Sequence, residues 1–444
     1  MSEKKFFDKE IEQFDHQQLK ALQWSKLEPL LHHTYDKSPF FRRHWDKAGV
    51  NLEKVTSLEA FREMIPTVEK SDFLGDQLEN PPWGTRLSTG VAKDQRLEIY
   101  TTSGTSGQGS EIHIQTPREI VEMARMYSYG FTWAGLKPGD LSVITLPLTM
   151  MAGGRVEYDA ALGFGMTTLP IGNYDAQQKL SLIERFKPLA LYGSTTYFMH
   201  LAAVSEKDVR DSSIEIMLTG LEGASIPYVQ RLEETWGAKA FDRFGAAQMR
   251  SDFMFNCEYG FGGTSNPGVL HNIDPYAYLE VLNIETGQPV QDGEYGEIVI
   301  TSLYHYDSPL IRCRMRDGGI FRTGKSCKCG RHFDGLQVCS IGRTDDVKKI
   351  KGVNIYPQAL DKAVFSISEI DEYVVHLTSS ENGADVATLK AMLKSEIDQL
   401  LAEEIRNNLA RSLHQVLGIH FEVVITEIER SDYKTKRWID ERDR

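Results

Sequence analysis

The chain has 444 residues, with 63 acidic and 50 basic side chains and a formal net charge of −13. Its hydrophobic content of 41% and charged content of 25% are those of an ordinary globular protein, and its length allows two or three domains. The acidic balance argues against a binder of nucleic acid or anionic membranes, and no apolar run is long enough to span a membrane. With no signal-peptide pattern and only five cysteines, a cytoplasmic enzyme is expected, although a large binding protein has the same composition.

Residues 1–80 are predicted to be helical. Five leucines recur at spacings compatible with one helix face, namely Leu19, Leu22, Leu27, Leu30 and Leu31. Prolines then punctuate the segment, at Pro39, Pro66, Pro81 and Pro82.

A run of small hydroxyl residues and glycines follows at 100–107, between strands predicted at 96–100 and 111–114. Glycine lets the backbone approach a ligand closely, and hydroxyls add donors beside the N–H groups, so the run favours an anion-binding loop suited to phosphate. A flexible surface turn is the alternative. The loop lacks the Gly-Lys-Ser/Thr ending of P-loop NTPases, which disfavours that family.

From 95 to 300, strands and helices alternate. Strands are predicted at 142–146, 166–170, 190–192 and 214–218, and helices at 175–186 and 226–236, a pattern typical of a parallel α/β sheet. The runs 277–282 and 296–300 indicate antiparallel strands. Residues 346–444 are predicted as a small α+β unit with a β-like run, a long amphipathic helix over 389–417 and a final strand over 421–425.

Several segments in order then carry a family resemblance. They are the residues 35–43 with 48–50, the loop 102–107, Gly220-Leu221-Glu222, Phe241 to Gln248 in the pattern Phe-Asp-Arg-Phe-Gly-Ala-Ala-Gln, Pro309 to Asp317 in the pattern Pro-Leu-Ile-Arg-Cys-Arg-Met-Arg-Asp, and the run 342–357. Together they resemble the adenylate-forming acyl-CoA synthetases, and most closely the phenylacetate–CoA ligase branch.

The resemblance implies an α/β architecture of two domains. Residues 1–344 would bind ATP, the acid and a zinc ion, and residues 345–444 would form a small mobile domain with the catalytic lysine. The implied reaction joins a carboxylic acid, best an aryl or arylacetic acid such as phenylacetate, to CoA through an acyl-AMP intermediate, with ATP and Mg²⁺. Two alternatives stay open: an enzyme that transfers the acyl group to a carrier protein or an amine, and a catalytically weak paralogue that binds nucleotide or acid. A homodimer is also possible under this resemblance. No nucleic-acid or membrane partner is expected.

The resemblance also implies residue roles. Lys434 would stabilise charge at the carboxylate and α-phosphate, with Lys436 as its competitor. Asp345 would be the hinge of the second domain, and Gly352 would line the path of CoA. The implied nucleotide-binding residues are Thr101, Thr102, Ser103, Gly104, Thr105, Ser106, Gly107, Gly220, Leu221, Glu222, Asp242, Phe244, Gly245, Ala246, Gln248, Asp317 and Arg343.

Asp317 would accept hydrogen bonds from both ribose hydroxyls, and Phe244 would stack on the purine unless it belongs to the core. Tyr197, Gly245 and Ala246 would line the acid pocket, with walls from 147–154 and 194–199.

Two positions depart from the family pattern. Gln248 stands where the family commonly has a glutamate that helps to hold Mg²⁺, and an amide is a poorer ligand for a hard cation. Gln108-Gly109 follows the phosphate loop where many members have a lysine, so less fixed positive charge is available for pyrophosphate.

A metal site is the last expectation. Cys327-Lys328-Cys329 is a Cys-x-Cys turn, and the branch resemblance adds Cys257 and His271, which would complete a tetrahedral Cys₃His zinc site. His332 and Cys339 are alternative ligands, and ordinary unliganded thiols are the other interpretation. Cys313 is expected in the core.

Overall fold

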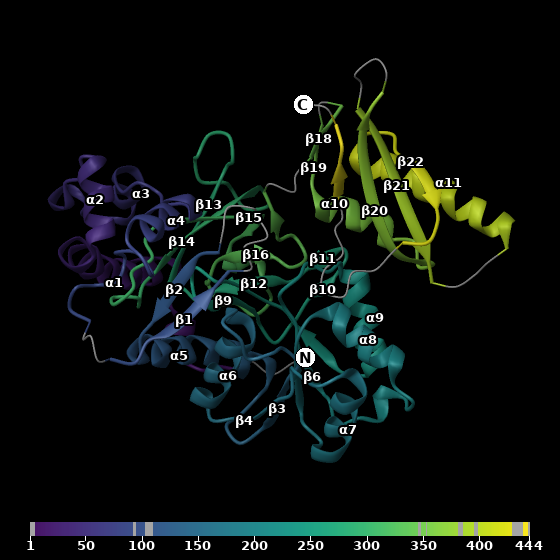
Figure 1. Ribbon diagram of the computed structural model, residues 1–444, viewed down its shortest axis with the longest axis horizontal. Coiled ribbons are helices and arrows are strands. Elements are labelled where there is room, and N and C mark those ends of the chain that lie inside the picture. Colours follow the sequence, from purple (N-terminus) through teal and green to yellow (C-terminus); the bar gives the residue numbers. More distant parts are fainter. Residues whose placement is uncertain are drawn as a thin grey trace. The chain divides into compact units, whose positions relative to one another are not determined.

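The computed structural model describes residues 5–91, 95–102, 110–344, 348–351, 353–380, 385–394, 398–428 and 438–442. The chain divides into two compact units, one made of residues 1–222 and 229–338 and the other of residues 223–228 and 339–444. Figure 1 shows the helices and strands of each unit, coloured along the sequence.

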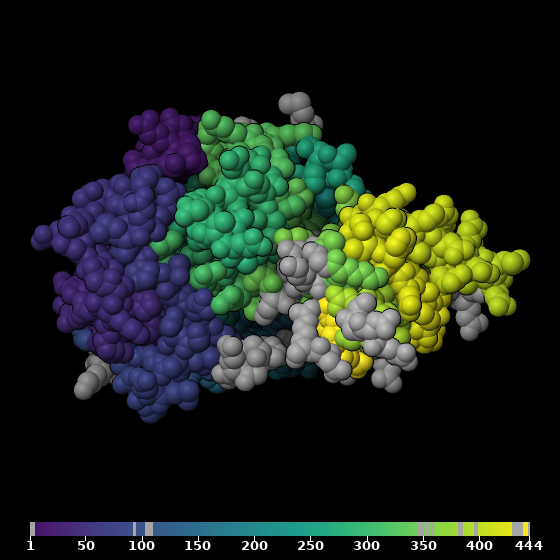
Figure 2. Space-filling model, turned by 90° about the horizontal axis from the view of Figure 1, so that it is seen from above, coloured from purple at the N-terminus to yellow at the C-terminus, as the bar shows by residue number. Residues whose placement is uncertain are grey.

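The first unit begins with helices that pack through leucine and aromatic side chains. Helix α1 starts after Asp15, whose carboxylate accepts from the backbone N–H of Gln18 at 2.9 Å while the Gln18 side chain accepts from the N–H of Asp15. Four of the five predicted leucines are buried, with Leu27 and Leu30 fully enclosed, and Leu22 is half-buried. The bounds are η1 Ile11–Gln13, α1 His16–Lys37, α2 Pro39–Lys47, η2 Leu52–Lys54, α3 Leu58–Met64 and α4 Lys70–Glu79. Purple and dark-blue residues of this segment form a continuous surface against green residues of later strands in Figure 2.

A two-stranded hairpin follows. Strands β1 (Glu98–Thr101) and β2 (Ile112–Gln115) pair antiparallel with Thr101 opposite Ile112, so the hairpin predicted around the hydroxyl- and glycine-rich loop is confirmed. Helix α5 (Pro117–Ala134) comes next, with proline in its first turn and a left-handed glycine, Gly135, at its end.

The predicted parallel sheet has the strand order β4-β3-β5-β6-β7. Strands β5 and β6 are buried along their whole length, as expected for a parallel sheet covered by helices on its faces (Figure 1). The bounds are β3 Leu141–Ile144, α6 Ala152–Phe164, β4 Thr167–Pro170, α7 Ala176–Phe186, β5 Ala190–Tyr192, α8 Thr195–Val204, η3 Val209–Asp211, β6 Ile216–Leu218, α9 Ile226–Trp236 and β7 Lys239–Phe241. Ligands of such sheets bind beyond the carboxyl ends of the strands, where the turn after β6 lies.

An antiparallel sheet completes the first unit, in the order β13-β14-β15-β16-β12-β9-β8. It packs on α5 at Gly130, where a Cβ atom would come within 2.3 Å of the Phe255 ring. The bounds are β8 Arg243–Ala246, β9 Ser251–Asn256, β10 Gly262–Gly263, β11 Asn266–Pro267, β12 Val269–Asn272, β13 Ala277–Leu282, β14 Tyr295–Ser302, β15 Cys313–Arg322, η4 Gly324–Ser326 and β16 Gly335–Gln337. Cys313 is fully buried, as expected.

The second unit has a sheet in the order β22-β21-β20-β23, with β20 and β21 antiparallel and both edge strands parallel to their neighbours. Its core joins Leu360 and Val364 of α10 with Leu409 and Leu413 of α11 and the inward side chains of the sheet. The bounds are β17 Gly342–Arg343, β18 Lys348–Ile350, β19 Val353–Ile355, α10 Pro357–Phe365, β20 Ile370–Ser379, β21 Asp385–Leu393, α11 Gln399–Leu417, β22 Glu422–Ile425 and β23 Trp438–Asp440.

The prediction of one helix over 389–417 is wrong for the first residues of that range. Residues Asp385–Leu393 form strand β21, in which Ala387, Leu389 and Ala391 are buried with the period of two expected of a strand. Helix α11 begins only after Asp398, whose side chain accepts from the N–H of Leu401 at 2.9 Å.

Within the described ranges, no helix is both long and apolar enough to cross a membrane.

Candidate active site and metal cluster

The turn after β6 carries three of the predicted nucleotide-binding residues. Glu222 accepts hydrogen bonds from Thr195 Oγ1 at 2.8 Å and from the N–H of Thr196 at 2.7 Å, so its carboxylate caps the first turn of α8. A Cβ atom on Gly220 would lie 3.1 Å from the carbonyl oxygen of Arg243. Leu221 has a φ of 74° and is 52% exposed. The turn is therefore anchored by Glu222 while it presents an apolar side chain to solvent.

Strand β8 lies beside this turn and carries a buried arginine. Arg243 Nη2 is 2.7 Å from Glu157 Oε2, its Nε is 3.6 Å from Asp252 Oδ2, and its guanidinium lies 4.1 Å from the Tyr192 ring centre. Among the described residues, none of its side-chain nitrogen atoms has an aligned hydrogen bond. Charge and ring contact thus hold Arg243 between the predicted ligands Asp242 and Phe244.

Asp242 is partly exposed. Loss of water around its carboxyl raises the pKa to about 7, although a hydrogen bond from Thr219 acts the other way. The Phe244 ring packs edge to face against buried Phe253, with centres 5.6 Å apart. Part of the Phe244 ring therefore belongs to the core.

Small residues are required where the sequence predicted the floor of the acid pocket. A Cβ atom on Gly245 would come within 2.2 Å of Asp252 Oδ1 and 2.3 Å of the Ser251 carbonyl. The adjacent Ala246 pairs with Ser251 across the β8–β9 hairpin. Tyr197, the predicted pocket wall, accepts a hydrogen bond from Lys179 Nζ at 2.8 Å. Its hydroxyl is thus engaged with α7.

The turn of that hairpin carries Gln248, whose Nε2 atom donates to Glu111 Oε2 at 2.9 Å. Glu111 is held opposite Thr102, because its N–H donates to Thr102 Oγ1 at 2.9 Å and its carbonyl accepts from the Thr102 N–H at 3.1 Å. The adjacent Thr101 donates its N–H to the Met150 carbonyl at 2.9 Å. The structure therefore brings Gln248 to the base of the predicted phosphate loop.

Two further donors surround Glu111. Lys70 Nζ lies 3.6 Å from Oε2 and His113 Nε2 lies 3.7 Å from Oε1. Arg86 Nη2 donates to His113 Nδ1 at 3.0 Å, which leaves the ring proton on Nε2, facing Glu111. Burial lowers the pKa of His113 to about 4, so the ring is neutral at pH 7. Burial alone would raise the pKa of Glu111, but these donors lower it below its ordinary value and keep it ionised.

Sequence reasoning missed this role of Glu111. Its only signal was its position directly after the loop, and the pairing with Gln248 spans more than a hundred residues. Contact arises because β2 and the β8–β9 turn meet in the folded unit.

Asp317 lies partly buried in β15, and the three arginines of the motif before it are engaged in ion pairs, Arg316 with Glu69 at 2.6 Å. Arg312 forms a forked pair with buried Glu280 at 2.9 and 3.0 Å, and Arg314 Nε lies 3.1 Å from Glu297 Oε2. This part of the motif stabilises the sheet that carries Asp317.

Several predicted residues lie outside the described ranges. They are Ser103, Gly104, Thr105, Ser106, Gly107, Asp345, Gly352 and Lys434. Arg343 lies half-buried in β17 of the second unit.

The predicted metal ligands do come together. The donor atoms of Cys257, His271, Cys327 and Cys329 all lie within 4.8 Å of one another. The Sγ atoms of Cys257 and Cys327 are 3.6 Å apart, and Cys329 Sγ is 3.5 Å from His271 Nε2. These separations match the edges of a tetrahedron with metal bonds of about 2.0–2.3 Å, which are about 3.3–3.8 Å long.

The hydrogen bonding of His271 also fits a role as a metal ligand. Its Nδ1 atom is 2.8 Å from the carbonyl oxygen of Phe333, so Nδ1 donates and the lone pair of Nε2 faces the thiols. The alternative ligands His332 and Cys339 are not members of the group formed by the described residues.

A buried arginine stands beside the metal ligands. Arg331 donates its N–H to Cys329 Sγ at 3.4 Å, and its guanidinium bridges Glu12 and Glu258, each at 2.7 Å. Trp133 Nε1 donates to the same Glu12 carboxylate at 2.8 Å. The cluster is therefore tied to the N-terminal segment.

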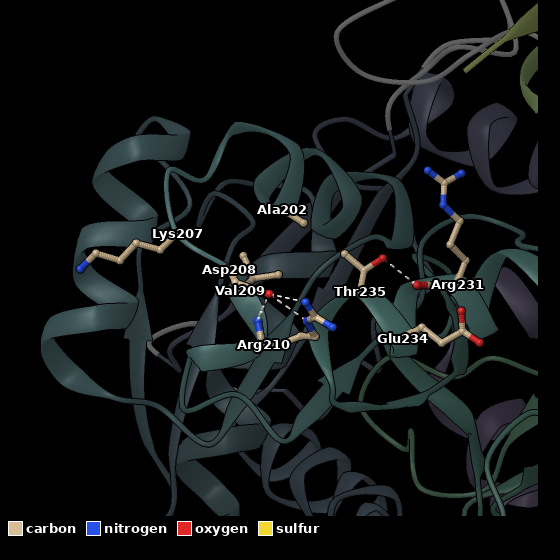
Figure 3. A pocket seen from close by; sticks show the side chains of 8 residues that line it. All are labelled: Ala202, Lys207, Asp208, Val209, Arg210, Arg231, Glu234 and Thr235. Carbon is tan, nitrogen blue, oxygen red and sulfur yellow. Dashed lines mark hydrogen bonds and ion pairs between the residues drawn. The ribbon is translucent and has the colours of Figure 1, made fainter. Parts of the chain in front are cut away.

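A surface hollow of the first unit lies elsewhere, among residues of α8, η3 and α9 (Figure 3). Within it, Arg210 Nε lies 2.9 Å from Asp208 Oδ2, and the hydroxyl of Thr235 donates to the backbone carbonyl of Arg231 at 2.8 Å. The hollow contains none of the residues predicted to bind nucleotide or acid.

Comparison with known proteins decides the family. The model of the AMP-binding enzymes matches residues 37–304, and the model of the C-terminal domain of AMP-binding enzymes matches residues 352–442. The chain belongs to the AMP-binding enzyme family. It is an enzyme of the AMP-forming acyl-CoA ligase kind, and the predicted relationship is confirmed.

Curated relatives of this AMP-binding enzyme include two phenylacetate-coenzyme A ligases. The one from Thermus thermophilus is 25% identical over 438 residues, covering 94% of this chain and 95% of the relative. The one from Escherichia coli K12 is 26% identical over 434 residues, covering 95% of each.

A similar solved structure is that of 2-hydroxyisobutyryl-CoA ligase in the postadenylation state with 2-HIB-AMP. It has a TM-score of 0.87 at 24% identity and covers 97% of this chain and 91% of that one. The α/β fold with a large N-terminal and a smaller C-terminal part is thereby confirmed.

Proposed function

We propose that this enzyme joins an aryl or arylacetic acid, of the phenylacetate type, to CoA through an acyl-AMP intermediate. The observation that carries the proposal is the similarity to phenylacetate-coenzyme A ligases over nearly the full length of both chains. Tyr197, Gly245 and Ala246 would line the pocket for the acid.

In this proposal the first half-reaction depends on charge neutralisation, since the acid and the α-phosphate of ATP are both anions. Residues 101–107 would hold the β- and γ-phosphates, and Lys434 would face the reacting carboxylate and α-phosphate. Thiol attack by CoA on the acyl-AMP then releases AMP, with Asp345 as the hinge and Gly352 beside the CoA arm.

The nucleoside would lie along the turn after β6. Asp242 and the exposed part of Phe244 would contact the adenine beside Gly220, and Asp317 would accept hydrogen bonds from the ribose hydroxyls. Arg343 is a further proposed nucleotide ligand.

The test is exchange of labelled pyrophosphate into ATP across a panel of carboxylic acids. We expect acid-dependent exchange, strongest with phenylacetate and its ring-substituted analogues, and loss of exchange in Lys434→Ala with the fold intact. Absence of exchange across the panel would contradict the proposal. If Lys436→Ala abolished exchange and Lys434→Ala did not, the catalytic lysine would be Lys436.

CoA-dependent release of AMP from the preformed intermediate tests the acceptor. AMP release with a carrier protein or an amine, but not with CoA, would favour the alternative acceptors.

We also propose that the cluster of Cys257, His271, Cys327 and Cys329 holds a structural zinc ion. The support is the donor set, its tetrahedral spacing and the Phe333 carbonyl behind His271. When bound, zinc would cross-link β12 to the turns at 257 and 327–329. Elemental analysis of the purified protein should give about one zinc per chain, and less than about half would contradict the site.

A further inference from the structure

Two buried arginines of the first unit, Arg86 and Arg250, differ from the others in having no carboxylate partner. Arg250 is fully enclosed and Arg86 is 5% exposed, and neither guanidinium lies within 4.0 Å of a carboxylate oxygen among the residues that the structure describes. The other buried arginines, Arg243, Arg312 and Arg331, each have such an oxygen at 2.7–2.9 Å. A buried charge is costly unless an opposite charge compensates it, so these two guanidinium groups call for a counter-ion.

Arg86 and Arg250 approach the same loop, which follows β14. Arg250 Nη2 donates to the carbonyl oxygen of Ser308 at 2.9 Å. The N–H of Ser88, two residues after Arg86, donates to the carbonyl oxygen of Asp307 at 2.7 Å. Burial and the positive charge of Arg250 lower the pKa of Arg86 to about 9, so Arg86 is still charged at pH 7 and lies near a like charge.

The side chains around the two arginines carry polar atoms that are not used. The buried atoms without a hydrogen-bond partner among the described residues include Arg86 Nη1, Tyr100 OH, both polar side-chain atoms of Gln115, Arg250 Nε and both ring nitrogens of His305. Gln115 lies on the same face of β2 as His113, two positions before it, and Arg86 Nη2 donates to His113 Nδ1 at 3.0 Å. Each of the five side chains can donate at least one hydrogen bond, and none is a carboxylate.

The acids of this region are already engaged elsewhere. Glu119 accepts three backbone N–H groups at 2.9–3.1 Å, and Glu111 Oε2 lies 3.6 Å from Lys70 Nζ. Both buried histidines are neutral at pH 7, because burial lowers their pKa. The three cations Arg86, Arg250 and Lys70 therefore face only two carboxylates, which leaves at least one positive charge in excess.

We propose that this buried region is a binding site for one small monovalent anion of the chloride type, held between Arg86 and Arg250 and by the donors of Gln115 and His305. Such an anion balances the excess charge and accepts hydrogen bonds from groups that otherwise lose them on burial. The site lies on the buried face of β2 and contains none of the residues proposed to bind nucleotide or acid, so it does not depend on the proposed function.

The experiment is thermal unfolding of the full chain without nucleotide, in sodium chloride and in sodium gluconate at equal ionic strength. Gluconate carries the same charge but is too large for a site without access to solvent. Chloride should raise the unfolding temperature by several degrees, and the rise should level off as the site fills. With a dissociation constant of about 10 mM, chloride at about 100 mM would raise the folding equilibrium constant about tenfold.

Gln115→Met tests the site, because it removes a donor and keeps the size of the side chain. The difference between the two salts should then fall several-fold. Gln77→Met is the matched control, since the Gln77 amide is used in two hydrogen bonds with the backbone of Ile112, at 2.7 and 3.1 Å. This control should unfold at a lower temperature in both salts and keep the full difference between them.

Crystals of the wild-type protein grown in bromide give a second measurement, which is independent of how the variants fold. An anomalous peak between Arg86 and Arg250 is expected. Water at that position in place of bromide would overturn the proposal. Equal unfolding temperatures in chloride and gluconate, or an undiminished difference in Gln115→Met, would also overturn it.

Discussion

Two buried arginines of the first unit, Arg331 and Arg243, are each placed between two acids but are held in different ways. Arg331 makes aligned hydrogen bonds to Glu12 and Glu258, each at 2.7 Å. Arg243 lies close to Glu157 without an aligned hydrogen bond and rests on the Tyr192 ring.

The bonding of each arginine can be related to the role proposed for its region. Directional bonds around Arg331 specify one arrangement of the N-terminal segment beside the metal cluster. Charge and ring contact around Arg243 depend less on angle, so the strand with Asp242 and Phe244 can adjust when a nucleotide arrives. The region beside the metal cluster and the region proposed to bind the nucleotide thus use the same residue types with different geometry.

The largest effect is expected from Arg331→Met. It leaves Glu12 and Glu258 buried without their cation, which should cost about 3–5 kcal/mol of unfolding free energy in urea denaturation. Arg210→Met, on an exposed ion pair, is the control and should leave the midpoint unchanged. Equal midpoints for the two variants would show that the hydrogen bonds of Arg331 to Glu12 and Glu258 contribute little to stability.

Loss of the metal should have the next largest effect. Cys329→Ser removes a ligand and weakens the acceptor of the Arg331 N–H, so zinc content and the temperature of unfolding should fall together. Added chelator should lower the unfolding temperature of the wild-type protein but not that of the variant. A variant that still binds one zinc would contradict the ligand set.

Lysine at the two arginine positions sharpens the comparison. Arg243→Lys keeps the charge and should cost about 1–2 kcal/mol, whereas Arg331→Lys should cost more because one ammonium group cannot reproduce the aligned bonds to both Glu12 and Glu258. ATP binding, measured by calorimetry, should weaken several-fold only in Arg243→Lys. A larger loss of stability in Arg243→Lys than in Arg331→Lys would show that the two arginines are not held in the different ways described above.

The smallest effect is expected from Asp242→Asn, and it depends on pH. The pKa of Asp242 is raised to about 7 in the fold against about 3.9 unfolded, so the unfolded chain loses its proton first. The contribution of the Asp242 carboxyl to the free energy of unfolding is fully present below pH 4 and is lost as the pH rises through 7. A shift of about three pKa units corresponds to about 4 kcal/mol at most, and solvent around the partly exposed carboxyl reduces this. The free energy of unfolding of the variant should therefore exceed that of the wild-type protein by about 1 kcal/mol at pH 8 and differ little at pH 4, in thermal unfolding at both values. A gain at pH 4 instead would contradict the raised pKa.

Local patterns were enough for much of the fold. The leucine stripe of α1, the apolar runs of β5 and β6 and the hairpin around the hydroxyl-rich loop can be predicted because periodicity reflects which face is buried. The strand at Asp385–Leu393 is not predicted by the sequence pattern, because its apolar residues lie close to those of helix α11. Their spacing is compatible with the period of a strand and also with that of a helix.

For the site, the sequence by itself determined the order of its motifs and, through the resemblance that they carry, indicated the family and a metal site at Cys257, His271, Cys327 and Cys329, with His332 and Cys339 left as alternative ligands. Only the tertiary structure decided which partners the charged residues have. Glu111 faces Gln248, Arg331 reaches Glu12 and Arg243 reaches Glu157 across 137, 319 and 86 positions of the chain. Contacts at such separations depend on how sheets and helices pack, and no local spacing encodes them.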